Sequence, residues 1–174
     1  MKIRFKQDKR TVLKILKTAS IKRKLRILDR LDGINQKDSV NILLKVLEDN
    51  SWVMREKAAH RLADFGNRVV PRLLRLLTRG FWYTRASACL ALGEIGNLKA
   101  LEAIISLTIN DDNPTVVKEA SEALVKLARN KPPEFSEQLR NISLNDSELV
   151  QILRVLDSAD PQICTAIKKE LEYE

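Results

Sequence analysis

Apolar residues recur along this chain at intervals of three and four, the spacing that gathers side chains on one face of an α-helix. Strand-forming residues show no run of strict alternation. The pattern therefore predicts an all-α fold of about eleven amphipathic helices. The expected helices cover residues 9–18, 21–31, 38–48, 51–65, 68–79, 82–95, 98–109, 114–131, 134–142, 146–156 and 161–172.

Two stretches of the chain match at an offset of thirty residues. Six residue types recur at equivalent places: Trp52 and Trp82, Arg55 and Arg85, Ala58 and Ala88, Leu62 and Leu92, Gly66 and Gly96, Asn67 and Asn97. A fixed period of this length is typical of stacked helix pairs. We therefore expect a single domain with an N-terminal basic helix in 1–19. Five repeats should follow at about 20–49, 50–79, 80–111, 112–144 and 145–174.

Small residues at one helix position should let neighbouring repeats approach closely. The expected contact residues are three alanines and, one turn later, three leucines that fill the space between repeats: Ala58, Ala88, Ala120, Leu62, Leu92 and Leu124. A single helix pair cannot bury both of its faces, so each repeat should depend on its neighbours.

Helix starts and stops are marked by polar caps and by glycine. Residues that favour an N-cap precede five of the expected helices: Ser20, Asp38, Asn67, Asn113 and Asp160. Pro114 and Pro161 follow two of them, in the first turn, where a missing N–H costs least. Gly33 with Asn35, and Gly66, should interrupt the chain between helices.

The composition fits a folded helical protein of a reducing compartment. Hydrophobic residues make up 44% of the 174 residues, and Gly and Pro number five each, too few for a loop-rich protein. The two cysteines, Cys89 and Cys164, are too few for a disulfide framework, and Cys89 should be a small buried side chain. No stretch resembles a membrane span or a signal peptide, so we expect a cytoplasmic protein.

The net charge of +8 is unevenly distributed along the chain. Residues 1–30 contain twelve Lys and Arg against two Asp, a net +10, whereas residues 145–174 carry a net −4. Residues 55–85 add a second basic region, with eight Lys and Arg against two acids. Such asymmetry bears on partners rather than on fold. It permits head-to-tail association of two copies and leaves the oligomeric state open.

The repeated residues resemble a known family. Trp52-Val53-Met54-Arg55 with Ala58 and Leu62, and Trp82-Tyr83-Thr84-Arg85 with Ala88 and Leu92, are similar to the bacterial HEAT repeat of the type found in phycobilisome lyases. The resemblance implies a right-handed α-solenoid of about five antiparallel helix pairs. It also implies that the second helix of each pair lines the concave side, and that the protein is more often a binding scaffold than an enzyme.

The catalytic relatives of that family supply further tests. HEAT-like deoxyhypusine hydroxylases bind iron through repeated His-Glu pairs, but this chain has one histidine, His60, followed by Arg61. No phosphate-binding glycine loop, Cys/His metal cluster or nucleophile–histidine set is present either. We therefore expect no cofactor, no metal and no enzyme activity. Bilin lyase activity stays an alternative, since repeats alone do not exclude it.

The clearest candidate site is a run of arginines spaced four, three and four residues apart: Arg68, Arg72, Arg75 and Arg79. This spacing places all four guanidinium groups on one helix face, with no acid between them. Arginine suits two-bond contacts to carboxylate or phosphate. A solvated face is the plainer interpretation. Ile105 and Ile109 stand at the matching positions of the next repeat and could add an apolar patch.

Other cations and aromatic residues have simpler expected roles. Arg55 and Arg85 recur with the repeat, so each should bond an acid or a carbonyl of the adjoining repeat. Trp52 and Trp82 should be structural, closing one end of each pair. The N-terminal cations form a secondary basic patch or the polar face of a terminal repeat: Lys22, Arg23, Lys24 and Arg26.

The sequence thus predicts a scaffold whose basic concave groove binds an acidic segment of a partner protein. A nucleic-acid-binding protein of the DNA-repair type is the main alternative, because relatives that are alkyl-base glycosylases act on DNA and the same arginines could contact phosphates. The identity of the partner does not follow from the sequence.

Overall fold

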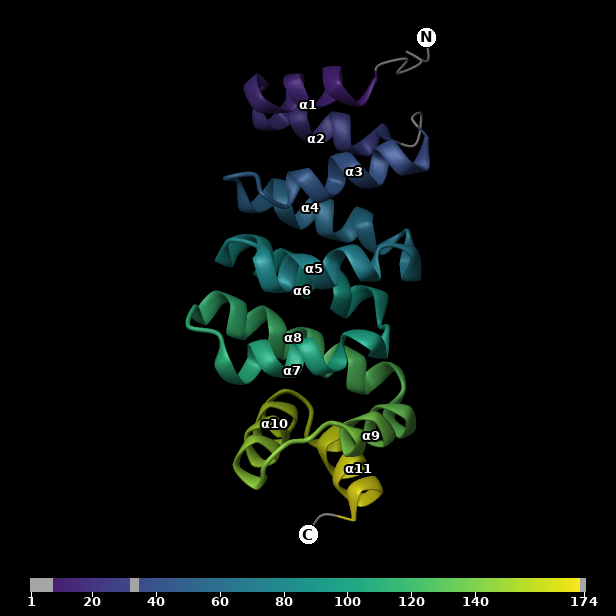
Figure 1. Cartoon of the computed structure of the whole chain (residues 1–174), viewed down its shortest axis with the longest axis vertical. Coiled ribbons are helices and arrows are strands. Elements are labelled where there is room, and N and C mark those ends of the chain that lie inside the picture. Colours follow the sequence, from purple (N-terminus) through teal and green to yellow (C-terminus); the bar gives the residue numbers. More distant parts are fainter. Residues whose placement is uncertain (1–7, 32–34, 173–174) are drawn as a thin grey trace.

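The computed structural model describes residues 8–31 and 35–172, and this part of the chain is helical throughout, without a strand (Figure 1). Its α-helices are α1 (Lys9–Thr18), α2 (Ile21–Asp29), α3 (Gln36–Val46), α4 (Trp52–Ala63), α5 (Val70–Arg79), α6 (Trp82–Ile95), α7 (Leu101–Asn110), α8 (Pro114–Asn130), α9 (Pro132–Asn141), α10 (Asp146–Ala159) and α11 (Pro161–Leu171). Two 3₁₀ turns, η2 (Gly66–Arg68) and η3 (Leu98–Ala100), precede α5 and α7.

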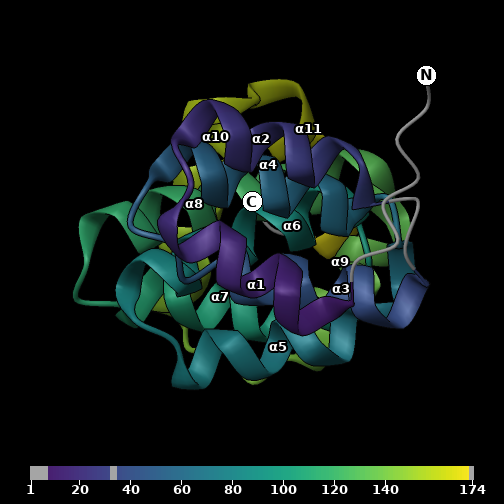
Figure 2. The ribbon, with the colours of Figure 1, turned by 90° about the horizontal axis from the view of Figure 1, so that it is seen from above.

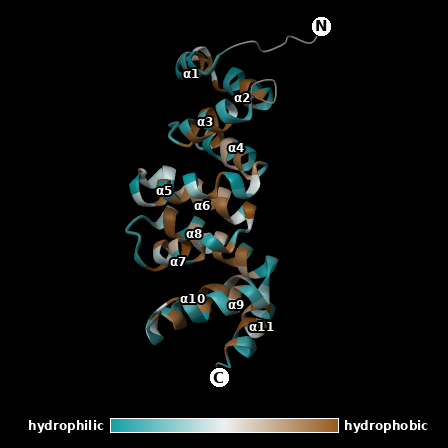
Figure 3. Cartoon of the chain, turned by 45° about the vertical axis from the view of Figure 1, so that its right-hand side comes forward, coloured by the Kyte–Doolittle hydropathy of each residue, from teal (hydrophilic) through white to brown (hydrophobic). Residues whose placement is uncertain are grey.

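The helices form two layers that run the length of an α-solenoid, which confirms the predicted fold class. Helices α2, α4, α6 and α8 stack in one layer, and α1, α3, α5 and α7 lie in the other (Figure 2). Neighbours in the first layer pack closely, α4 on α6 and α6 on α8, whereas α3, α5 and α7 touch one another little. Apolar residues concentrate between the layers (Figure 3).

The close packing of the first layer depends on small residues. Every alanine and leucine expected at the repeat contact is fully buried: Ala58, Ala88, Ala120, Leu62, Leu92 and Leu124. Gly93 of α6 continues this contact, because a Cβ added there would lie 2.9 Å from Cα of Ala123 in α8. Missing side chains therefore set the distance between α6 and α8.

Polar side chains join each repeat to the next at the surface. Lys57 of α4 forms an ion pair with Asp29 of α2 at 2.7 Å, and Arg129 of α8 bonds Asp160 at 2.6 Å. The repeated asparagines meet as well, since Asn97 Nδ2 donates to Asn67 Oδ1 at 2.7 Å. Because these contacts are exposed, they add little to stability and mainly fix how one repeat is aligned on the next.

Several caps follow the expectation. Asn113 and Asp160 accept backbone hydrogen bonds at the starts of α8 and α11. Gly66 and Gly96 adopt left-handed backbone, with φ of 57° and 69°. The expected interruption at Gly33 lies outside the described residues.

Two expected caps are wrong, and a third, Ser20, stands at the N-cap position of α2 without a side-chain hydrogen bond. Asn35 rather than Asp38 caps α3, because its Oδ1 accepts from the Asp38 N–H. Asn67 does not cap α5, because η2 intervenes and the residue at the N-cap is Val69. The Asn67 side chain instead pairs with Asn97 of the next repeat.

The regular stacking changes after α8. In a continued solenoid α9 would pack on α7, yet it is α10 that contacts both α7 and α8, while α9 packs against α11 (Figure 1). Pro132 and Pro133 stand in the first turn of α9, directly after α8 ends at Asn130. Because proline disfavours helical backbone in the residue before it, Lys131 leaves the helical region, with φ of −150° and ψ of 72°, and the chain turns there.

Candidate functional site

Helix α5 has one apolar face and one arginine face. Val70, Leu73 and Leu77 are buried against the solenoid, at spacings of three and four. Arg72, Arg75 and Arg79 occupy the other face of α5, and Arg68 precedes them in η2. We call these four residues the arginine face. Three of these residues lie on α5, whereas Arg68, expected on the same helix, belongs to the 3₁₀ turn before it.

The first two arginines are held by neutral amides of α3 in the preceding repeat. Arg68 Nη1 donates to Gln36 Oε1 at 3.1 Å, and Arg72 Nη2 donates to Asn41 Oδ1 at 2.6 Å. An amide orients the guanidinium group without neutralising its charge. The two bonds therefore couple α5 to α3 and leave the face positive.

The other two arginines have no side-chain partner within residues 8–31 and 35–172. Arg75 and Arg79 are both exposed. Elsewhere several cations that join repeats meet carboxylates, as Lys57 meets Asp29 and Arg129 meets Asp160. The arginine face is thus a place where positive charge is left uncompensated.

A hollow of about 310 Å³ lies beside this face, between α3 and α5. Its lining residues are Asn41, Leu44, Lys45, Glu48, Arg72, Arg75 and Leu76. Lys45 and Glu48 form an ion pair with each other, so Arg72 and Arg75 supply the net charge of the hollow. Leu44 and Leu76 give it an apolar floor. The hollow can accommodate an extended segment that presents carboxylates to the arginines.

The predicted apolar extension of the site is partly wrong. Ile105 is only 2% exposed, because α7 is packed between α8 and α10 and this side chain belongs to the core. Ile109, four residues later, is half-buried. Matching positions in two repeats therefore have different surroundings, since α5 has no helix on its outer face comparable to α10.

The secondary basic patch is smaller than predicted. Lys22, Arg23 and Arg26 of α2 are exposed, as expected for a polar face. Lys24 is not available in the same way, because its Nζ lies 2.9 Å from Asp49 Oδ2 and the pair is largely buried. The remaining patch is on the first layer, away from α5.

Arg85 forms a two-bond ion pair with a largely buried carboxylate. Its Nε and Nη2 donate to the two carboxylate oxygens of Asp111, at 2.7 and 2.9 Å, and Nη1 donates to the Gly80 carbonyl at 3.2 Å. The bond to Asp111 raises the pKa of the Arg85 guanidinium, although burial opposes this. Arg85 thus bonds an acid within the chain, but Asp111 and Gly80 lie in its own repeat of 80–111 rather than in the adjoining one.

Arg55, the equivalent residue of the preceding repeat, has no carboxylate partner in the described part of the chain. Its Nη1 donates to the Asp49 carbonyl at 2.7 Å, and Nε is buried without an acceptor. The guanidinium carbon lies 5.5 Å from the Trp52 ring and 5.1 Å from the Tyr83 ring. Burial lowers the pKa of Arg55, and the nearby Asp49 offsets part of this effect. Aromatic faces thus replace the carboxylate here.

The two repeated tryptophans differ. Trp52 is half-buried beside Arg55, in line with a structural role, whereas Trp82 is 43% exposed and touches Tyr83 edge-on. The neighbouring Phe81 is 67% exposed. Sequence reasoning missed Phe81, which occupies the N-cap position where the preceding repeat has Ser51.

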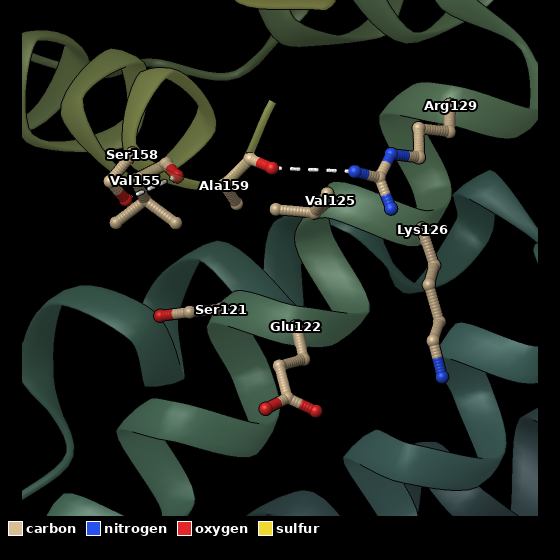
Figure 4. A pocket seen from close by; sticks show the side chains of 8 residues that line it. All are labelled: Ser121, Glu122, Val125, Lys126, Arg129, Val155, Ser158 and Ala159. Carbon is tan, nitrogen blue, oxygen red and sulfur yellow. Dashed lines mark hydrogen bonds between the residues drawn. The ribbon is translucent and has the colours of Figure 1, made fainter. Parts of the chain in front are cut away.

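A second hollow, of about 320 Å³, lies between α8 and α10 (Figure 4). Arg129 is engaged there with Asp160 and the Ala159 carbonyl, and Lys126 with Glu94. The described residues contain no His/Cys/Asp/Glu group able to hold a metal ion. Both cysteines are buried, and burial raises the pKa of each thiol, which keeps them protonated. Neither cysteine lines this hollow, and its two hydroxyls, of Ser121 and Ser158, donate to the carbonyls of Val117 and Val155.

No helix within residues 8–31 and 35–172 combines the length and the hydropathy needed to cross a bilayer.

Comparison with known proteins agrees with the repeat architecture. No curated protein matches the chain. Among solved structures, a designed armadillo repeat protein in complex with the peptide (KR)4 is similar at 15% identity and a TM-score of 0.42, over 95% of this chain and 100% of that one. The family model for HEAT repeats matches residues 10–81 and 70–158. The chain therefore belongs to the HEAT repeat family.

Proposed function

We propose that this HEAT repeat protein is a non-enzymatic scaffold whose arginine face binds an acidic segment of a partner protein. Proteins built from such repeats generally act as interaction scaffolds, with binding surfaces formed by consecutive repeats. The segment would lie along α5, over the hollow between α3 and α5. Its carboxylates would then meet Arg75 and Arg79.

The uncompensated charge of the arginine face carries this proposal. Four guanidinium groups on one face repel one another and lower the stability of α5. Two of them are held only by Gln36 and Asn41, and Arg75 and Arg79 have no partner in the described part of the chain. A bound carboxylate would relieve the repulsion and form charge-assisted hydrogen bonds.

The test is a charge reversal at the two unpartnered arginines. The variant Arg75→Glu/Arg79→Glu should lose binding of a labelled all-glutamate peptide, measured by fluorescence anisotropy, and should no longer retain the partner from the native lysate. The matched control is Lys131→Glu/Lys169→Glu, which changes the net charge equally at two exposed sites away from α5. Equal losses in both variants would show that net charge alone drives binding.

The dependence of affinity on salt concentration distinguishes a peptide ligand from a nucleic acid. Neutralising several phosphates makes affinity fall by about 10³-fold or more between roughly 50 and 200 mM salt. A segment that also covers Leu44 and Leu76 should be less sensitive. Tighter binding of an oligonucleotide than of the acidic peptide, lost in the Arg75→Glu/Arg79→Glu variant, would replace the proposal with the nucleic-acid alternative.

A further inference from the structure

The large hydrophobic side chains that the described part of the chain exposes are Ile21, Val53, Phe81 and Trp82. All four stand at the starts of successive helices of the first layer, α2, α4 and α6. These helices run in the same direction, so their starts lie along the edge of the solenoid where the turns from α1, α3 and α5 arrive (Figure 1). We call these residues the apolar edge.

The aromatic part of the apolar edge is built as a stack. The Phe81 ring lies on the Tyr83 ring, with centroids 5.4 Å apart and planes inclined by 16°. Tyr83 in turn covers the guanidinium of Arg55, whose other neighbour is Trp52. The Trp82 ring is nearly perpendicular to the Tyr83 ring, with centroids 5.6 Å apart. The stack has a free outer surface, because Phe81 is 67% exposed.

The surroundings of this stack are positive. Arg79 is two residues from Phe81, within about 7 Å along the chain. The starts of α2 and α6 have no side-chain cap and no acid in the first turn, so their N–H groups carry uncompensated positive charge. At the start of α4 the Asp49 carboxylate accepts from the Ser51 N–H and offsets this charge. Arg55 adds a buried Nε without an acceptor in the described structure. The starts of α8, α10 and α11 are capped by Asn or Asp side chains.

We propose that the acidic segment bound by the arginine face also carries an aromatic residue, which packs on Phe81 and Trp82. This inference rests on the proposed function and specifies which acidic segments the arginine face would bind. Carboxylates pair with Arg75 and Arg79 along α5, and the chain then passes over the turn between α5 and α6. A rigid stack loses little entropy on binding, so one aromatic anchor contributes usefully there.

The next turn along the same edge favours a peptide over a nucleic acid. It carries Asp111 and Asp112, and the Asp112 side chain is 95% exposed. A phosphate backbone that stacked its bases on Phe81 would have to continue past these carboxylates, in a direction without a basic groove. A single aromatic side chain at the end of an acidic stretch needs no such path.

Two peptides and one variant test the inference. The probes are a labelled all-glutamate peptide and the same peptide with phenylalanine at one end, measured by anisotropy. The wild type should bind the phenylalanine peptide roughly threefold to tenfold more tightly, the contribution of one aromatic contact. The variant Phe81→Ser/Trp82→Gln should bind both peptides with the affinity that the wild type shows for the all-glutamate peptide. The single variant Phe81→Leu, which keeps Trp82, should retain part of the gain in affinity for the phenylalanine peptide.

Intrinsic fluorescence gives an independent measurement, since the only tryptophans of the chain, Trp52 and Trp82, both lie at the stack. Only the phenylalanine peptide should change their emission. The inference is overturned if the gain is absent in the wild type, if it persists in Phe81→Ser/Trp82→Gln, or if oligothymidylate changes the emission at lower concentration. Failure of the all-glutamate peptide to bind the wild type would overturn the proposed function as well. Circular dichroism confirms that the variants are folded.

Discussion

Gly93 in α6 and Ala123 in α8 bring two backbones into contact. A Cβ added to Gly93 would lie 2.9 Å from Cα and 3.0 Å from Cβ of Ala123. Glycine lowers the intrinsic stability of a helix interior, by about 1 kcal/mol relative to alanine. Its presence in the last turn of α6 is explained by this close approach to α8.

Gly93→Ala should therefore destabilise the protein although alanine is the better helix former. The added methyl group meets backbone atoms, so the helices must separate, at a cost of about 1–3 kcal/mol. Chemical denaturation measures the effect. Ser106→Ala, at an exposed position of α7, is the control and should change the free energy of unfolding by no more than about 0.5 kcal/mol. An increase in stability for Gly93→Ala would contradict the close contact.

Leu92→Ala should cost about 2–5 kcal/mol of unfolding free energy, because Leu92 is fully buried between repeats and leaves a cavity. Lys57→Ala removes only an exposed ion pair with Asp29 and should stay within roughly 1 kcal/mol. Thermal or urea unfolding followed by circular dichroism compares the two. Equal losses would mean that the buried face of α6 has been misidentified.

Asp111→Asn should destabilise the protein at neutral pH and matter less in acid. Burial raises the pKa of Asp111, but hydrogen bonds from Arg85 and the Asn113 N–H outweigh it, so the folded pKa lies below the usual value. The stability from this carboxylate is present above about pH 4 and is lost as pH falls through the folded pKa. At pH 7 the variant should lose about 1.5–3 kcal/mol.

The control for that experiment is Asp112→Asn. The Asp112 carboxylate is 95% exposed and lies 3.5 Å from Arg85, so its removal should change the unfolding free energy by no more than about 0.5 kcal/mol. A difference between wild type and Asp111→Asn that stayed constant down to pH 3 would show that the ion pair is not what the variant loses.

Glu119→Gln should stabilise the protein at pH 7, by up to about 1 kcal/mol. Glu119 is 6% exposed, and burial raises its pKa; Glu122 and Glu56 add to this, while Lys118 and Lys126 oppose it. The folded state thus resists the charged form, and the wild type gains relative stability as pH falls through the raised pKa. The advantage of the variant should vanish in acid. Glu137→Gln, at an exposed position of α9, should leave the free energy of unfolding unchanged at either pH.

The helical layout and the repeat contacts could be predicted because they follow from local periodicity. Apolar spacing located the helices to within a few residues, and the matched alanines and leucines identified the buried contact correctly. Arg85 forms an internal ion pair as expected, since a residue that recurs with a repeat is usually part of its packing, but its partner lies in its own repeat. These features depend on a repeat and its immediate neighbour.

Other features depend on contacts that no local pattern records. Ile105 matches Arg75 in sequence but is buried, because α10 reaches back to α7 after the turn at Lys131. Asn67 looked like a cap, and its actual partner, Asn97, lies thirty residues away. The exposure of Phe81 and Trp82, and the amide partners of Arg68 and Arg72, likewise required the relative positions of neighbouring repeats.

The unequal packing of the two layers gives the solenoid a direction of easy bending. The helices α4, α6 and α8 are in close contact, so their separations are stiff, whereas α3, α5 and α7 touch one another little. Pivoting about the tight layer would change the width between α3 and α5 while keeping most buried area, at the cost of the hydrogen bonds from Arg68 to Gln36 and from Arg72 to Asn41. A ligand bound between α3 and α5 that widened this gap would therefore tilt the outer repeats relative to each other.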